Sequence, residues 1–248
     1  MLRKIFAKVS GKTEQQIMND HLRKAAIKGN LARVQKLVKE GAEVDCKDVN
    51  DLTPLYFASG RGFLDITRFL LEQGANPNVG AETGIGPPLV QAGHNGDSAM
   101  IMLLLEFNAD INAINYSRRT ALHLASAQNH LEAATLLLDH GSDPNTVDRM
   151  GYTPLHDAVG FDYRALALKL AECGADGSLE FKYGDDIRKK AEQRGSADIV
   201  QALDDYKLKA AREAAAEKAV LDQNIAAAPV LQNDIAIKKP LIIKPKTP

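Results

Sequence analysis

Two histidines in similar surroundings are the residues most able to do chemistry in this sequence. His123 lies in RTALHLASAQ and His156 lies in GYTPLHDAVG, and a histidine can act as an acid, a base or a metal ligand near neutral pH. Two further segments of the same kind, DLTPLYFASG and GPPLVQAG, carry Tyr56 and Val90 at the corresponding place. A catalytic or ligand role would not survive such replacement in a repeated segment. We therefore expect both histidines to be structural.

The other reactive side chains form no pattern typical of an enzyme or a metal site. His94, His130 and His140 have no HExxH or comparable spacing. Neither Cys46 nor Cys173 lies in a CxxC motif or a Cys/His cluster. The glycine-rich GIGPP stretch contains prolines, which remove the amide donors that a phosphate-binding loop needs. We expect no catalytic, cofactor-binding or metal-binding residue and no enzymatic activity.

Two columns of residues recur along the chain with a fixed period of 33 or 34 residues. The alanine column is Ala25, Ala58, Ala92, Ala125, Ala158 and Ala191, and the leucine column is Leu37, Leu70, Leu104, Leu137, Leu170 and Leu203. A fixed period of this size predicts a stacked array of similar units, in which each unit contacts only its neighbours.

Each unit is predicted to contain two helices. A Thr-Pro pair opens the first, because Thr can cap free backbone N–H groups and Pro at the first helical position loses no hydrogen bond. The second carries apolar residues such as Ile66, Phe69 and Leu70 at helical spacing. It should end at residues that tolerate the left-handed conformation. These are Gly41, Gly74, Asn108, Gly141 and Gly174.

Together, the TPLH segments, the LLxxGA ends, the alanine column and the period resemble the ankyrin-repeat family over about residues 19–208. The resemblance implies an all-α solenoid whose units each have a β-turn or hairpin and two antiparallel helices. It also implies that the His of TPLH hydrogen-bonds within and between turns. The predicted units are 19–47, 48–80, 81–114, 115–147, 148–180 and 181–208, and the first and last depart from the pattern as terminal caps.

Composition agrees with an all-α protein. The 248 residues are 45% hydrophobic and 25% charged, with no Trp and only 5% aromatic residues, which favours helix packing through Leu, Ala, Ile and Val. Two cysteines suggest a reducing compartment. Because we find neither a long apolar run nor a secretory signal, we predict a cytoplasmic location.

The net charge of −1 conceals an uneven distribution of charge along the chain. Residues 1–18 and 205–248 each carry +3, which leaves about −7 for residues 19–204. This balance does not favour a nucleic-acid partner, and we expect none.

The resemblance implies that a protein partner binds at the hairpin tips and in the concave groove. The candidate partner-binding residues are Tyr116, Arg119, Arg149, Met150, Tyr152, Phe161, Leu52, Arg61 and Asn95. The first six form the preferred contact patch, because units four and five concentrate Tyr, Arg and Met, which are enriched at interfaces. The alternative is that the aromatic residues of the tips pack on adjacent hairpins.

The two ends of the chain differ from the array. In residues 1–18, one helical face carries Leu2, Ile5, Phe6 and Val9 and the others carry basic residues. This segment could dock on the first unit, contact a membrane surface weakly or direct the chain to an organelle. Residues 209–226, rich in Ala, Lys and Glu, predict a single helix. The basic, Pro-containing residues 227–248 predict a disordered tail or a strand-adding docking motif.

The sequence therefore predicts a monomeric, non-enzymatic adaptor or scaffold that binds a protein partner and needs no cofactor. A peripheral membrane adaptor anchored by the N-terminal segment is the alternative, and an enzyme or its obligate subunit is a third hypothesis.

Overall fold

The structure, a computed structural model, describes residues 11–80, 86–178 and 186–227. Within these residues, helices follow one another in pairs and no strand forms, so the predicted all-α fold is confirmed. The pairs are α2 (Glu14–Ile27) and α3 (Leu31–Lys39), α4 (Pro54–Gly60) and α5 (Leu64–Glu72), α6 (Pro88–Asn95) and α7 (Ser98–Glu106), α8 (Ala121–Ala127) and α9 (Leu131–Asp139), α10 (Pro154–Gly160) and α11 (Arg164–Glu172), and α12 (Ile187–Gln193) and α13 (Ala197–Ala227).

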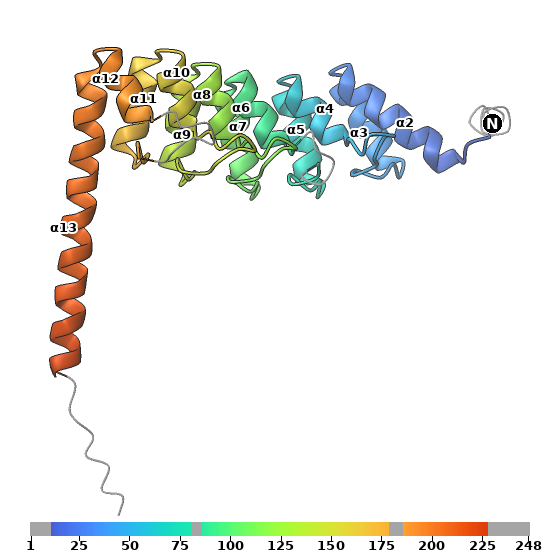
Figure 1. Cartoon of the computed structure of the whole chain (residues 1–248). Helices are drawn as coiled ribbons and strands as arrows, with labels where there is room; N and C mark the ends of the chain where they lie inside the picture. The colour runs from blue at the N-terminus through green and yellow to red at the C-terminus, as the bar shows by residue number, and fades with distance from the viewer. Residues whose placement is uncertain (1–10, 81–85, 179–185, 228–248) are drawn as a thin grey trace, which may run out of the picture. The chain divides into compact units, whose positions relative to one another are not determined.

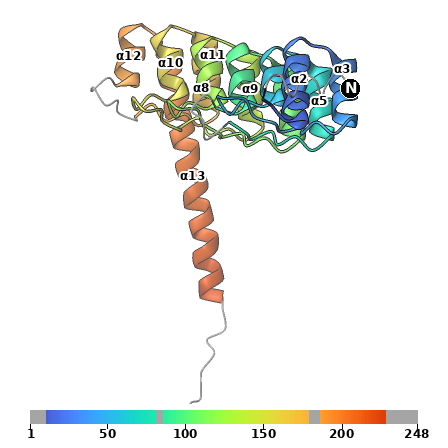
Figure 2. The same ribbon diagram turned by 90° about the vertical axis from the view of Figure 1, so that its right-hand side faces the viewer.

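The helix pairs stack in chain order. The first helices of successive pairs contact one another from α2 to α12, and the second helices do so from α3 to α11 (Figure 1). The turns that join one pair to the next gather along one side of the stack (Figure 2). This arrangement is the predicted solenoid. The chain divides after Lys207 into two units. The described residues of the first unit form this stack, and those of the second are the remainder of α13, to Ala227.

The boundaries that the sequence predicts for the six units remain predictions. Each predicted unit contains one helix pair except at the two ends of the array. Helix α2 begins before residue 19, at Glu14, and α13 continues past residue 208 to Ala227, so the predicted helix 209–226 is part of the same helix. The cap of α2 is Thr13, whose side chain accepts from the backbone of Gln16 while the Gln16 side chain accepts from Thr13. Leu2, Ile5, Phe6 and Val9 and the predicted tail 228–248 lie outside the described residues.

Local sequence explains where the helices begin and end. Thr53 caps α4 by accepting from the Tyr56 amide (3.2 Å), and Pro54 occupies the first helical position. The second helices are followed by residues with φ between 62° and 96°, as predicted. These residues are Gly41, Gly74, Asn108, Gly141 and Gly174.

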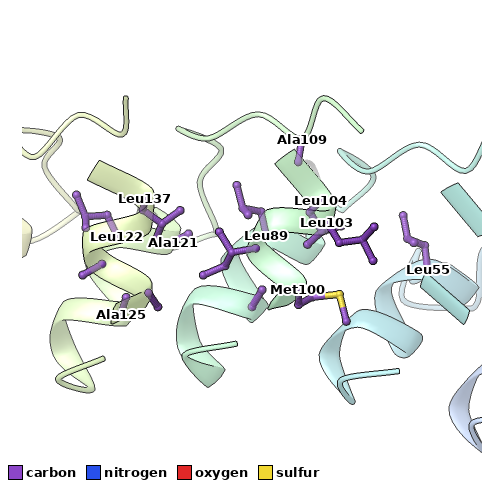
Figure 3. Packing of buried hydrophobic residues seen from close by; sticks show 14 of the residues in the cluster. Leu55, Leu89, Met100, Leu103, Leu104, Ala109, Ala121, Leu122, Ala125 and Leu137 are labelled. Atoms are coloured by element: carbon purple, nitrogen blue, oxygen red, sulfur yellow. The ribbon is translucent and has the colours of Figure 1, made fainter. Parts of the chain in front are cut away.

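The two columns lie in the core, where every member is at most 5% exposed. Leucines of successive units, among them Leu55, Leu89 and Leu122, line up through the stack (Figure 3). Burial of each such leucine contributes about 1.5–3 kcal/mol. The backbones of α6 and α8 approach closely at Gly93, since a Cβ atom added there would lie 2.5 Å from the carbonyl oxygen of Ala121 in α8.

A column of amide and carboxylate side chains connects the turns of successive units. The Oδ1 atom of Asn78 accepts from the Asp110 backbone N–H (2.8 Å), and the Oδ1 atom of Asn145 accepts from that of Asp176 (2.7 Å). Asn112 bonds in the same way to Asp143, and Asp45 to Asn76. Each turn therefore satisfies a backbone donor of the next unit.

Candidate functional site

The tips of units four and five are rigid turns built by one side chain each. The Oδ1 atom of Asn115 accepts from the amides of Ser117 (2.9 Å) and Arg119 (3.0 Å). Asp148 accepts in the same way from Met150 (2.8 Å) and Tyr152 (2.9 Å). The backbone between these anchors is therefore held in a defined turn.

The two tips contact each other directly. The backbone N–H of Arg149 donates to the carbonyl oxygen of Ser117 (2.9 Å). The Arg149 guanidinium lies 3.8 Å from the centroid of the Tyr116 ring, a cation–π contact. Tyr116 is nevertheless 64% exposed and Met150 45% exposed. The tips thus present an aromatic ring, a cation and a thioether side chain to solvent.

Arg119 is engaged within its own chain rather than offered to a partner. Its guanidinium bonds to Asp157 of α10, and its Nε atom lies 3.8 Å from Oδ2 of Asp148. Burial raises the pKa of Asp157 to about 6, although the Arg119 charge acts in the opposite direction. Arg119 therefore ties the tip of unit four to unit five.

The two histidines of the opening motif belong to the scaffold. The Thr120 backbone N–H donates to Nδ1 of His123 (3.2 Å), so Nε2 carries the proton and donates to the Tyr152 carbonyl oxygen (3.0 Å). The Nδ1 atom of His156 accepts from Thr153 in the same way (2.9 Å). Burial lowers the pKa of His123 to about 4. These contacts agree with the structural role predicted from the sequence.

The remaining predicted site residues lie elsewhere or are covered. Leu52 is 8% exposed, and the half-buried Tyr152 ring contacts the His156 ring edge-on, with centroids 5.6 Å apart. Three more of the predicted site residues lie at the C-terminal ends of the first helices, whereas the tips precede the N-terminal ends of these helices. These three residues are Arg61, Asn95 and Phe161. Phe161 is 61% exposed and stacks on Tyr163. The structure therefore brings together Tyr116, Arg149 and Met150.

Sequence reasoning missed Arg118, an exposed residue of the unit-four tip with φ of +60°. The signal was present in the aligned tips DVNDL, NYSRR and DRMGY, where the fourth residue is Asp51, Arg118 and Gly151. All three have positive φ, a conformation that glycine adopts most easily.

Three further findings on the described residues concern metal binding, cysteine reactivity and membrane-spanning helices. In the ranges that the structure describes, no three His, Cys, Asp or Glu side chains are grouped to hold a metal ion. Burial raises the pKa of the Cys46 thiol to about 11, so this thiol is protonated at neutral pH. No described helix has the length and apolar character needed to cross a membrane.

Comparison with known proteins gives one consistent relationship. A family model of ankyrin repeats, in three copies, matches residues 22–113 and 89–180. The putative ankyrin repeat protein YahD of Escherichia coli is 27% identical over 185 residues, which cover 72% of this chain and 92% of YahD. The potassium channel KOR1 of rice is 27% identical over 203 residues, and the chicken nuclear factor NF-kappa-B p105 subunit is 31% identical over 180 residues. These matches cover 68% and 69% of this chain but only 23% and 18% of those proteins.

Proposed function

Because the chain belongs to the ankyrin-repeat family, whose repeats generally mediate protein–protein interaction, we propose that it is a non-enzymatic adaptor or scaffold that binds a protein partner at the tips of units four and five. We define the tip surface as Tyr116, Arg118, Arg149 and Met150. The cytoplasmic location and monomeric state remain predictions from the sequence.

The observation that carries the proposal is the exposed stack of Arg149 on Tyr116 beside Met150. Tyr, Arg and Met are enriched at protein interfaces. The ring and the guanidinium already contact each other, and hydrogen bonds hold the turns that carry them, so binding should lose less side-chain entropy than it would with groups that make no such contacts. We leave Leu52 and Arg119 out of the surface, because Leu52 is buried and Arg119 is bonded to Asp157.

We predict that Tyr116→Ala weakens partner binding by about tenfold or more, the effect of losing a central aromatic contact. Proximity labelling in the native cell would identify candidate partners, and calorimetry with the purified partner would measure the affinity. Val49→Ala is the matched control, since Val49 is an almost fully exposed tip residue of unit two. Both variants should keep the melting temperature of the unmodified chain.

Phe161→Ala distinguishes the tips from the ends of the first helices. Loss of binding in this variant, with Tyr116→Ala unaffected, would move the binding surface to the group formed by Arg61, Asn95 and Phe161.

A further inference from the structure

The charged side chains at and beside the tips of units four and five divide into an exposed cationic set and a less exposed acidic set. Arg118 and Arg149 are exposed. The side chain of Asp148 is only 9% exposed, because it bonds to the backbone of its own turn and lies beside Arg119. Asp157 bonds to the same Arg119. At the described tips of units four and five, Asp148 and Asp157 thus pair with Arg119, and the charged side chains exposed to solvent are Arg118 and Arg149.

Arg118 occupies a backbone conformation that disfavours its side chain. Its φ is +60°, and its N–H donates to the Asn115 carbonyl oxygen (2.8 Å) to close the turn. Gly151 occupies the corresponding place one unit later and adopts this conformation without a steric cost. An arginine in this place destabilises the turn, and a strained exposed residue is typical of a functional site.

The surroundings of Arg149 favour the binding of a planar anion. Its guanidinium carbon lies over the Tyr116 ring, and a guanidinium held by its contact with an aromatic face can still donate its N–H groups to a ligand. Those donors match the two oxygens of a carboxylate. Tyr116 and Met150 add apolar surface beside the charge.

We propose that the tip surface binds an acidic peptide segment of a protein partner, with carboxylates at Arg118 and Arg149 and an apolar side chain against Tyr116 and Met150. This inference rests on the proposed function, since it specifies the partner of the same surface. A nucleic acid is disfavoured, because its affinity depends on the number of phosphates neutralised. The surface offers two exposed guanidiniums, in a region, residues 19–204, that carries about −7.

The experiment selects displayed random peptides on the full-length chain and sequences the enriched pool. We expect enrichment of Asp and Glu around an apolar residue, with binding that weakens as salt rises. Arg118→Gly should weaken the selected peptides about tenfold or more, yet raise the melting temperature by about 2 °C. A loss caused by unfolding would lower that temperature.

Asp51→Gly is the matched control, because Asp51 has the same positive φ at the tip of unit two. It should raise the melting temperature by less, because Asp tolerates this conformation better than Arg and Asp51 also pairs with Lys47 (3.7 Å), and it should leave peptide affinity unchanged. Failure to enrich acidic residues, or equal binding by Arg118→Gly, would overturn the inference. Selected neutral peptides that lose affinity in Tyr116→Ala would overturn the acidic preference while supporting the proposed function. Tighter binding of a random single-stranded RNA pool, lost in Arg118→Gly, would assign the surface to nucleic acid instead.

Discussion

Gly93→Ala is expected to reduce the free energy of unfolding by about 3 kcal/mol, the upper part of the range for overpacking a core. The added Cβ would lie 2.5 Å from the carbonyl oxygen and 2.8 Å from the Cα atom of Ala121. Both are backbone atoms, so no side-chain rotation can relieve the contact. Helices α6 and α8 must move apart, and the leucines packed between the units lose contact.

Gly160→Ala is the matched control. Gly160 is the last residue of α10, does not have a left-handed φ, and has no atom within 4 Å of an added Cβ. Alanine should raise stability there by about 0.5 kcal/mol, through the smaller entropy of the unfolded chain. Urea unfolding of both variants measures the difference. Equal stabilities for the two would show that α6 and α8 do not approach as closely as described.

His123→Leu is expected to reduce the free energy of unfolding by about 1–3 kcal/mol, because it leaves the buried Thr120 N–H without its partner. The Thr120 N–H and the Tyr152 carbonyl oxygen both lose their imidazole contact. The Tyr152 carbonyl oxygen keeps a second donor, the Asp148 N–H (2.9 Å). His94→Leu is the control, since His94 is exposed, and its effect should stay within about 0.5 kcal/mol. A similar loss in both variants would contradict the structural role of His123.

The cost of removing His123 should also depend on pH. Its folded pKa is about 4, below the ordinary value of 6.5, because burial disfavours the charged ring. The unfolded chain therefore takes up a proton first as pH falls. The contribution of neutral His123 is full above about pH 6.5 and declines by about 3 kcal/mol toward pH 4. The stability difference between the unmodified chain and His123→Leu should shrink across this window.

The stability difference between the unmodified chain and His123→Leu is more informative than the total stability of either protein, because Asp157 also changes its protonation in this pH range. The pKa of Asp157 is raised to about 6, so the folded state takes up its proton first, and its effect on stability has the opposite sign below pH 6. Subtracting the His123→Leu curve from that of the unmodified chain removes most of the Asp157 effect. NMR of the ring gives an independent measurement, with a neutral, Nε2-protonated His123 expected down to about pH 4. A ring that titrates near 6.5 would contradict the prediction.

The sequence predicted the family and the helical stack because those depend on periodic features. Ala92 and Leu104 repeat with the period and lie in the core, and Asn108 takes the left-handed place that glycine fills in other units. Periodicity reports which residues occupy equivalent places, and in a stacked array equivalent places have equivalent burial.

Periodicity could not predict the partner of each tip side chain. Leu52 and Arg119 occupy the same place in their tips, and their amides are held in the same way by Asp48 and Asn115. Leu52 is nevertheless buried, whereas Arg119 forms an ion pair with the next unit. Nor could the sequence show that Arg119 reaches Asp157, because that contact joins residues 38 positions apart. These details depend on side-chain contacts between units, which differ from one unit to the next.

The column formed by Asp45, Asn78, Asn112 and Asn145 has an evolutionary consequence. Each member bonds to the same backbone position of the following unit. Excision of residues 115–147 would therefore bring Asn112 opposite the Asp176 amide and leave that donor satisfied. Gene duplication or loss of a whole unit therefore creates no mismatch in this column, so its hydrogen bonds allow the length of the array to change.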